Sequence, residues 1–220
     1  VSSGTTLTLA GFAQGAGGLT KVGLGTLTLL ANNNYSLGTT VNGGTLLVNG
    51  TQAQSTAVNA NAKLGGSGAV GAVTSTGGTI SPGQSPGILS TGNLSLNASS
   101  TFNVELNGTT PGTGYDRVAV NGSVTLGSAA LQVAVGYTPS PGDTFTIIQN
   151  DGTGDAVTGT FSGLANGAMF VPTGSYQFQI FYNGGDGNDV VLSYVGCVTD
   201  FSGPTVTPPA DTTVTQTLCQ

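Results

Sequence analysis

A short motif of Gly, Thr and Leu recurs at nearly regular intervals through the first part of the chain. Gly4-Thr5-Thr6-Leu7 is followed by Gly25-Thr26-Leu27 and Gly44-Thr45-Leu46, and looser copies occur at 62–66 and 78–80. The offsets between successive copies are 21, 19, about 18 and about 16 residues. Repeats of this length are typical of solenoids, in which a single coil cannot bury its apolar face but stacked coils can. The repeat therefore predicts a β-solenoid over residues 1–99.

The composition favours short strands and tight turns over helices. Gly contributes 38 of the 220 residues, and Val, Leu and Ile recur in alternating runs among Thr, Ser and Asn. Gly, Thr, Val, Ser and Asn all rank low in helix propensity. Asn-Gly pairs tolerate the positive φ of tight turns; they occur at 42–43, 49–50, 107–108, 121–122, 166–167 and 183–184. These features predict an all-β chain.

From about residue 100 the expected strands are longer and richer in aromatic residues. Alternating segments span 101–106, 117–120, 131–135, 144–148, 176–182 and 190–194. Of the 8 Phe and 6 Tyr residues, only Phe12 and Tyr35 precede residue 100. Because large side chains can close the apolar end of a stack of coils, residues 100–195 are predicted to form a capping segment. A separate antiparallel β domain is the competing interpretation.

Residues 196–220 form a third segment, rich in Pro and Thr. The pair Pro208-Pro209 favours an extended connection, so this segment is interpreted as a linker that leads to a terminal strand or to the start of an immunoglobulin-like module. An unpaired strand at 212–218 could pair with another chain. Its candidate assembly residues are Thr212, Val214, Gln216 and Leu218.

The two cysteines of the chain, Cys197 and Cys219, lie close to its end. A disulfide between them would close the intervening loop and add about 3 kcal/mol in the chain-entropy model. Two unpaired thiols, or a link between chains, are the alternatives. A chain of low charge and high Thr content resembles secreted proteins, in which disulfides persist. No run approaches the roughly 18–20 apolar residues of a membrane-spanning helix. A secreted or bacterial cell-surface protein is therefore expected.

Charge and missing residue types argue against several functions. The chain has 3 Lys and Arg against 9 Asp and Glu, and residues 1–104 contain Lys21 and Lys63 but no acid. Three scattered cations cannot neutralise a phosphate backbone, so nucleic acid is not expected as a partner. Since the chain has no His, it cannot form a Ser-His-Asp triad or an imidazole metal site. We expect no enzymatic activity and no cofactor.

The segment Gly184-Gly185-Asp186-Gly187-Asn188-Asp189 is the best candidate for a metal site. It matches the calcium-binding pattern G-G-x-G-x-D-x-U-x, with Asp186 and Asp189 as the carboxylates. That pattern works in tandem copies, because neighbouring turns share the ion, and one copy supplies fewer than the roughly six to eight oxygens that calcium takes. We therefore favour a glycine-rich turn that joins two strands, with calcium as the alternative.

Part of the chain resembles a known family. The segments LTKVGLGTLTL at 19–29, NYS at 34–36 and GTTVNGGTL at 38–46 resemble the autotransporter-associated β-strand repeat, although Gly38 is displaced and Leu24 replaces a small residue. Segments within 76–195 are similar to those that follow such repeats in passenger regions, among them SPGQSPG at 81–87 and YNGGDGNDVVL at 182–192. The resemblance implies a right-handed parallel β-helix on an exported surface protein, with no shared catalytic residues.

Three functions fit a β-solenoid of this kind. The first is a stalk or scaffold, because stacked coils make a rigid rod that rises about 4.8 Å per coil. The second is a self-assembling subunit of an extracellular filament or sheath, joined through coil ends or the strand at 212–218. The third is a glycan-binding adhesin, with Tyr35 as the main candidate for stacking on a sugar. The expected partners are other copies of the chain or other surface and matrix components.

Overall fold

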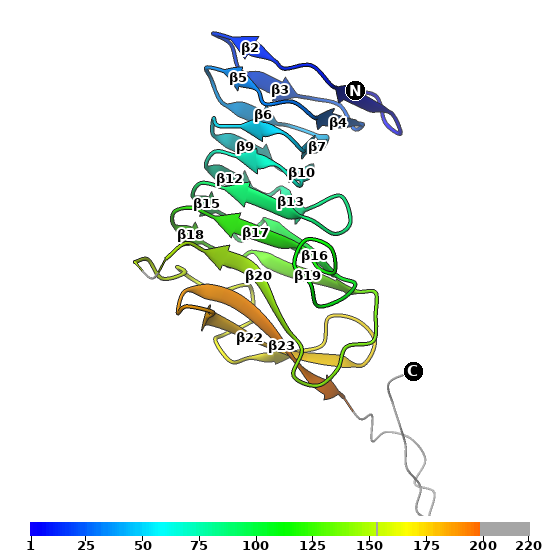
Figure 1. Cartoon of the computed structure of the whole chain (residues 1–220), viewed down its shortest axis with the longest axis vertical. Coiled ribbons are helices and arrows are strands. Elements are labelled where there is room, and N and C mark those ends of the chain that lie inside the picture. Colours follow the sequence, from blue (N-terminus) through cyan, green and yellow to red (C-terminus); the bar gives the residue numbers. More distant parts are fainter. Residues whose placement is uncertain (153, 199–220) are drawn as a thin grey trace, which may run out of the picture.

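The computed structural model describes residues 1–152 and 154–198. Strands are the regular elements among these residues, and no helix occurs among them. Successive triplets of short strands form the coils of a parallel β-helix, stacked from the N-terminus downward (Figure 1). The predicted all-β solenoid is confirmed.

Each coil contributes one strand to each of three faces. The first sheet contains β1 (Thr6–Leu9), β4 (Thr26–Leu29), β7 (Gly44–Val48), β10 (Ala62–Gly66), β13 (Thr79–Pro82), β16 (Thr101–Leu106) and β19 (Ala130–Val135). The second sheet begins with β8 (Thr51–Gln52), β11 (Ala69–Val70), β14 (Ile88–Thr91), β17 (Arg117–Val120) and β20 (Thr144–Asn150). The third contains β3 (Leu19–Lys21), β6 (Thr39–Val41), β9 (Thr56–Asn59), β12 (Val73–Thr76), β15 (Leu94–Ser95) and β18 (Val124–Thr125).

The pair formed by β2 (Gln14–Gly15) and β5 (Asn34–Tyr35) continues the second face toward the N-terminus. A bridge between Asn33 and Gln52 joins this pair to β8. All three faces therefore run through the N-terminal coils.

The inward side chains of the first sheet stack in a column that runs through the coils. Its members in register are Leu7, Leu27, Leu46, Leu64, Ile80, Phe102 and Leu131. The four central members, from Leu46 to Phe102, are fully buried. Complete burial of one such side chain contributes roughly 1.5–3 kcal/mol, so the repeated apolar position is what holds successive coils together. In the first repeat the strands pair one position away from the register in which Gly4 and Gly25 align, because Leu7 pairs with Leu27.

The glycine of the repeat motif has a structural cause at Gly44. This residue has a φ of +62°, which L side chains rarely adopt. A Cβ there would also lie 2.4 Å from the carbonyl oxygen of Gly25 in the coil above. Both the turn and the close approach of neighbouring coils require glycine at this position.

The coils lengthen toward the C-terminus. In the first sheet Lys63 pairs with Thr79, Thr79 with Thr101, and Thr101 with Ala130, so these coils contain 79 − 63 = 16, 101 − 79 = 22 and 130 − 101 = 29 residues, and the lengthening begins at β13. The additional residues include the loops 83–87 and 107–116. The parallel ladder nevertheless passes residue 99 without a break, because β13 pairs with β16 and β14 pairs with β17.

Antiparallel strands form a cap below the last coils. β23 (Asp189–Cys197) pairs with β20, and β22 (Tyr176–Gly184) and β21 (Met169–Phe170) follow outward in the second sheet. Phe145 of β20 contacts Tyr115, Tyr137 and Phe178, with ring centroids 5.4, 6.3 and 6.1 Å apart. The aromatic cap predicted from the sequence is therefore confirmed. It is a continuation of the second sheet and shares the core of the coils.

Candidate functional site

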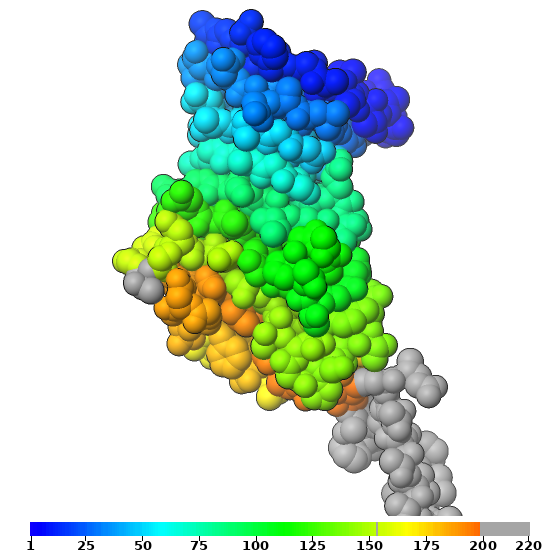
Figure 2. Space-filling model, in the orientation of Figure 1, coloured from blue at the N-terminus to red at the C-terminus, as the bar shows by residue number. Residues whose placement is uncertain are grey.

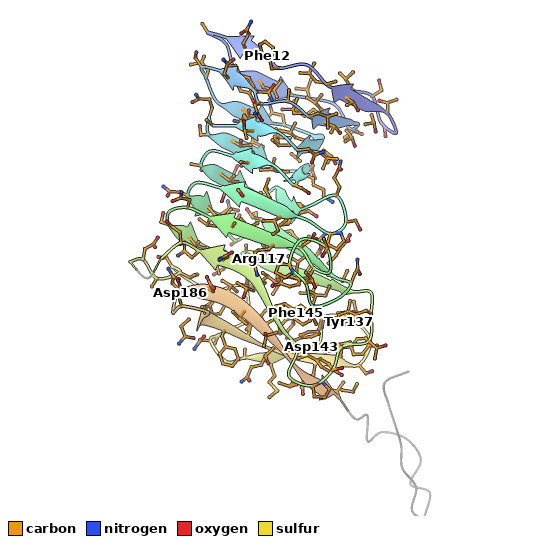
Figure 3. The ribbon with its side chains drawn as sticks, viewed as in Figure 1. Phe12, Arg117, Tyr137, Asp143, Phe145 and Asp186 are labelled. Carbon is orange, nitrogen blue, oxygen red and sulfur yellow. The ribbon has the colours of Figure 1, made fainter. Side chains whose placement is uncertain are left out.

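The first coil exposes apolar positions that later coils bury. Leu7 is 56% exposed, although its partner Leu27 in the next coil is buried, and Phe12 is 61% exposed. β1 and β3 are the outermost strands of their sheets, so one edge of each has no ladder partner in the described part of the chain. The first coil forms the uppermost surface in Figure 2, and Figure 3 shows Phe12 there. We call this surface, formed by β1, β2 and β3, the open end.

At the opposite end of the stack, antiparallel strands extend the second sheet and a bridge between Thr125 and Thr158 continues the third, whereas β19 is the last strand of the first sheet. A groove of about 650 Å³ remains beside β19, the last strand of the first sheet. β19 forms one wall, and the segment 162–173 with Leu164 and Phe170 forms the other. Within the described ranges β19 pairs only with β16, so its outer edge faces this groove. The two ends of the solenoid therefore differ in chemistry and in accessibility.

A second groove, of about 420 Å³, lies on the outer face of the first sheet. It crosses several coils and contains Thr45, Lys63, Ser81 and Glu105, with the loop around Gln84 at its rim. The neighbouring Ser85 donates a hydrogen bond to the Glu105 carboxylate and has a φ of +101°. The groove is lined mainly by polar groups, and it carries one cation and one carboxylate.

A buried carboxylate ties the loop 83–87 to the coils. The backbone N–H of Gly87 donates to Oδ1 of Asp116 at 2.8 Å, and the N–H of Glu105 donates to Oδ2 at 3.0 Å. Asp116 is 1% exposed, and burial raises the pKa of its carboxyl from 3.8 to about 6 against the opposing effect of those two hydrogen bonds. Asp116 therefore connects the loop 83–87 to β16, and burial disfavours the charged form of its carboxyl group.

Lys21 has a role that the sequence interpretation missed. Its side chain is 2% exposed, and its ammonium donates to the carbonyl oxygens of Val22, Gly23 and Gly43 at 3.1, 2.7 and 2.8 Å. Burial lowers the pKa of this amine. An ammonium has three donors, so Lys21 is fully satisfied as a bridge between the corners of two adjacent coils. The sequence signal that could have indicated this role is the lysine of the repeat motif, which is followed by Gly23 and Gly25.

The structure confirms the glycine-rich turn predicted at 184–189. β22 and β23 pair in antiparallel fashion on either side of it. Asp186 is exposed, and Figure 3 shows it near the β22–β23 hairpin, whereas Asp189 is 6% exposed and accepts a hydrogen bond from the Asn150 N–H at 2.9 Å. Burial raises the pKa of Asp189. In the part of the chain that the structure describes, no three His, Cys, Asp or Glu side chains gather as metal ligands.

The remaining predicted site residues lie in or near the chain end. Cys197 takes part in a disulfide, and its predicted partner Cys219 lies outside the described residues, so the pairing stays a prediction. The four assembly residues also lie outside the described residues; they are Thr212, Val214, Gln216 and Leu218.

The proposed sugar-stacking role of Tyr35 is wrong. Tyr35 is only 4% exposed, and its hydroxyl is hydrogen-bonded to that of Thr39 at 2.6 Å. The aromatic ring faces the interior because the strand β5 places it inside the coil, so it cannot present a flat surface to a glycan.

The described residues include no helix long and apolar enough to cross a membrane.

Two curated proteins are similar to most of this chain. The extracellular serine protease of Serratia marcescens is 32% identical over 181 residues, which cover 79% of this chain and 17% of the protease. The adhesin BmaC autotransporter of Brucella suis biovar 1 (strain 1330) is 38% identical over 201 residues, which cover 91% of this chain and 4% of the adhesin. The chain thus spans a small part of each relative. No protein-family model matches it. The stacked coils and these similarities together identify the chain as a parallel β-solenoid with distant homology to autotransporter passenger regions.

Proposed function

We propose that this chain is a non-enzymatic scaffold segment of an exported surface protein. The observation that carries the proposal is the continuous parallel ladder of the first sheet, from β1 to β19, around one apolar core. A stack of this kind is rigid along its axis, because every central coil is hydrogen-bonded to two neighbours. Homology to passenger regions supports a location on the cell surface or in the extracellular medium.

The different names of the two relatives support a scaffold. One is called a serine protease and the other an adhesin, yet each contains a region similar to this chain. A segment common to proteins of different activity is better suited to present another part of the protein than to perform either activity. The absence of His from the sequence agrees with a segment that carries no Ser-His-Asp triad.

Measurements of shape and activity on the purified chain test the scaffold proposal. Small-angle scattering and negative-stain microscopy are expected to show rods of one fixed length at every concentration. A peptidase assay on casein and a glycan array are expected to give no signal above the buffer control. Cleavage of casein would overturn the scaffold proposal in favour of an enzyme, and saturable binding to one glycan class would overturn it in favour of the glycan-binding alternative.

Self-association through the open end is a second candidate function, supported by the exposure of Leu7 and Phe12. Head-to-tail stacking is disfavoured because β20–β23 close the second face of the other end. The partner would therefore be the open end of a second copy. No acid precedes Glu105, so two such ends would meet without repulsion between carboxylates. Unpaired strand edges and uncovered apolar side chains are the features that such interfaces use.

Sedimentation velocity between micromolar and millimolar concentrations distinguishes the two candidates. The assembly hypothesis predicts a concentration-dependent dimer that Leu7→Asp abolishes. Val195→Asp places the same charge at a half-exposed position on β23 and is expected to leave the dimer intact. A monomer at every concentration would reject self-association and leave the scaffold.

A further inference from the structure

Two buried amide oxygens lie beside the β22–β23 turn without a hydrogen-bond partner in the described part of the chain. They are Oδ1 of Asn150, at the end of β20, and Oδ1 of Asn188, in the turn. Both residues are 2% exposed. An unsatisfied buried acceptor typically costs about 1–3 kcal/mol, and native proteins contain few of them. Two in one corner therefore point to a ligand that supplies positive charge or donors.

The orientation of both amides is determined by their other atoms. Nδ2 of Asn150 and Nδ2 of Asn188 each donate to the backbone carbonyl oxygen of Asp155 at 3.0 Å. A carbonyl oxygen can only accept, so rotating either amide by half a turn would bring two oxygens together. The two Oδ1 atoms are thus directed away from the Asp155 carbonyl oxygen, to which the Nδ2 atom of the same amide group donates.

A buried carboxylate completes the cluster. Asp189 directly follows Asn188, and its Oδ1 accepts the backbone N–H of Asn150 at 2.9 Å. A Cβ at Gly185 would lie 1.9 Å from Oδ2 of Asp189, so this oxygen rests against bare backbone at the turn. Asn150, Asn188 and Asp189 are therefore joined by hydrogen bonds and chain connectivity around one corner, although the end of β20 and the turn are distant in sequence.

We propose that this corner binds a hard divalent cation of the calcium class, through the amide oxygens of Asn150 and Asn188 and the carboxylate of Asp189. Calcium takes carboxylate, amide and water oxygens in a flexible geometry, whereas magnesium requires a nearly ideal octahedron. Asp186 lies in the same turn and adds negative charge near the site. The turn motif alone offers too few oxygens, and the end of β20 contributes the additional one.

The composition of the ligand set determines the expected affinity. Two of the three protein ligands are neutral amides, and no three carboxylates cluster among the described residues. Sites with few charged ligands bind calcium in the range of about 10⁻⁴–10⁻³ M, as in extracellular modules. We expect the site to be filled at millimolar calcium and largely empty at micromolar calcium.

Calorimetric titration and thermal unfolding of the purified chain test the site. Titration with CaCl₂ is expected to show one ion per chain, and 10 mM CaCl₂ is expected to raise Tm by about 3 °C or more. MgCl₂ at the same concentration, and NaCl at the same ionic strength, are expected to give much smaller shifts. No binding heat together with no shift, or equal shifts with all three salts, would overturn the proposal.

Variants identify the ligands. Asp189→Asn is expected to abolish the calcium-dependent shift, and Asn150→Ala to weaken calcium binding at least tenfold. The matched control is Asp151→Asn, a neighbouring carboxylate whose Oδ1 accepts the Gly122 N–H, and it should retain the full shift. If Asp189→Asn does not fold, Asn150→Ala and the wild-type titration still decide the question. Unchanged calcium binding in Asn150→Ala would contradict the assigned ligand set.

Discussion

At the level of single residues, the buried charged side chains Lys21 and Asp116 each form several hydrogen bonds to the backbone. The Lys21 ammonium bridges two coil corners through three carbonyl oxygens, and the Asp116 carboxylate receives two backbone N–H groups. Buried charges are tolerated when each has a complete set of hydrogen bonds. Both residues therefore link segments that are distant in sequence.

Replacement of the buried lysine is expected to destabilise the protein. Lys21→Met leaves the carbonyl oxygens of Val22, Gly23 and Gly43 without their shared donor, and the free energy of unfolding should fall by about 2–3 kcal/mol. Lys63→Met is the matched control, because Lys63 is only partly buried on the outer face and should change stability by less than about 0.5 kcal/mol. Urea denaturation measures both. Equal losses in the two variants would contradict the role of Lys21.

Asp116 is expected to make stability depend on pH. Its pKa rises from 3.8 to about 6 on folding, so the native state binds a proton between these values that the unfolded state does not. Its contribution to the free energy of unfolding is therefore largest below about pH 4 and decreases by up to about 3 kcal/mol as pH rises to above 6.

Urea denaturation at pH 4.5 and 7.5 measures this dependence. Asp116→Asn should lower stability at both pH values, because an amide can accept only through its oxygen. The variant should also lose the part of the pH dependence that Asp116 contributes. An identical pH dependence in wild type and variant would show that Asp116 does not titrate in this range.

At the scale of strands, position along the stack decides how much each apolar residue contributes. Leu7 and Leu64 occupy the same inward column, but Leu64 lies between Leu46 and Ile80 and is fully buried. Leu7 has a neighbouring coil on one side and is 56% exposed. The same side chain therefore has a different energetic role in β10 and in β1.

The leucine column offers an internally controlled test. Leu64→Ala is expected to lower the free energy of unfolding by about 2–5 kcal/mol, through lost burial and the cavity that remains. Leu7→Ala removes the same atoms from an exposed position and should lower it by less than about 1 kcal/mol. Thermal unfolding of both variants provides the comparison, and a larger loss for Leu7→Ala would show that the first coil is covered in solution.

At the scale of the whole molecule, the two ends of the solenoid are expected to differ in stability. Within the described ranges, antiparallel strands and aromatic packing cover much of the C-terminal end, whereas the first coil pairs with one other coil. Opening of a solenoid begins where an element has the fewest interfaces, because stability is the sum of repeat and neighbour terms.

Hydrogen exchange followed by mass spectrometry tests this gradient. Amides of β1 and β4 should exchange orders of magnitude faster than those of β10 and β13, which lie in the middle of the first sheet. The cap strands β22 and β23 should resemble the central coils. Uniform protection from the first coil to the cap would mean that the open end is covered by another copy, which sedimentation velocity would detect independently.

The repeating part of this protein follows from local properties of its amino-acid sequence. Inward leucines, corner glycines and the nearly regular spacing of the motif are local properties, and each coil repeats them, so the architecture and most strands could be predicted. The first offset was wrong by one position because Thr5 and Thr6 both precede Leu7, and only pairing with Leu27 establishes the register. Tyr35 was placed on the surface because alternation does not show which side of a short strand faces the core.

The features built from segments distant in sequence could be identified from the three-dimensional fold alone. Asp116 meets the loop 83–87, and Asn150 meets the turn at 188–189. The sequence contained each of these residues, but their spacing follows no repeat, because loops of different length separate them. Their contacts depend on where the long loops and the antiparallel cap strands pack against the coils. Local periodicity of the sequence does not specify that packing.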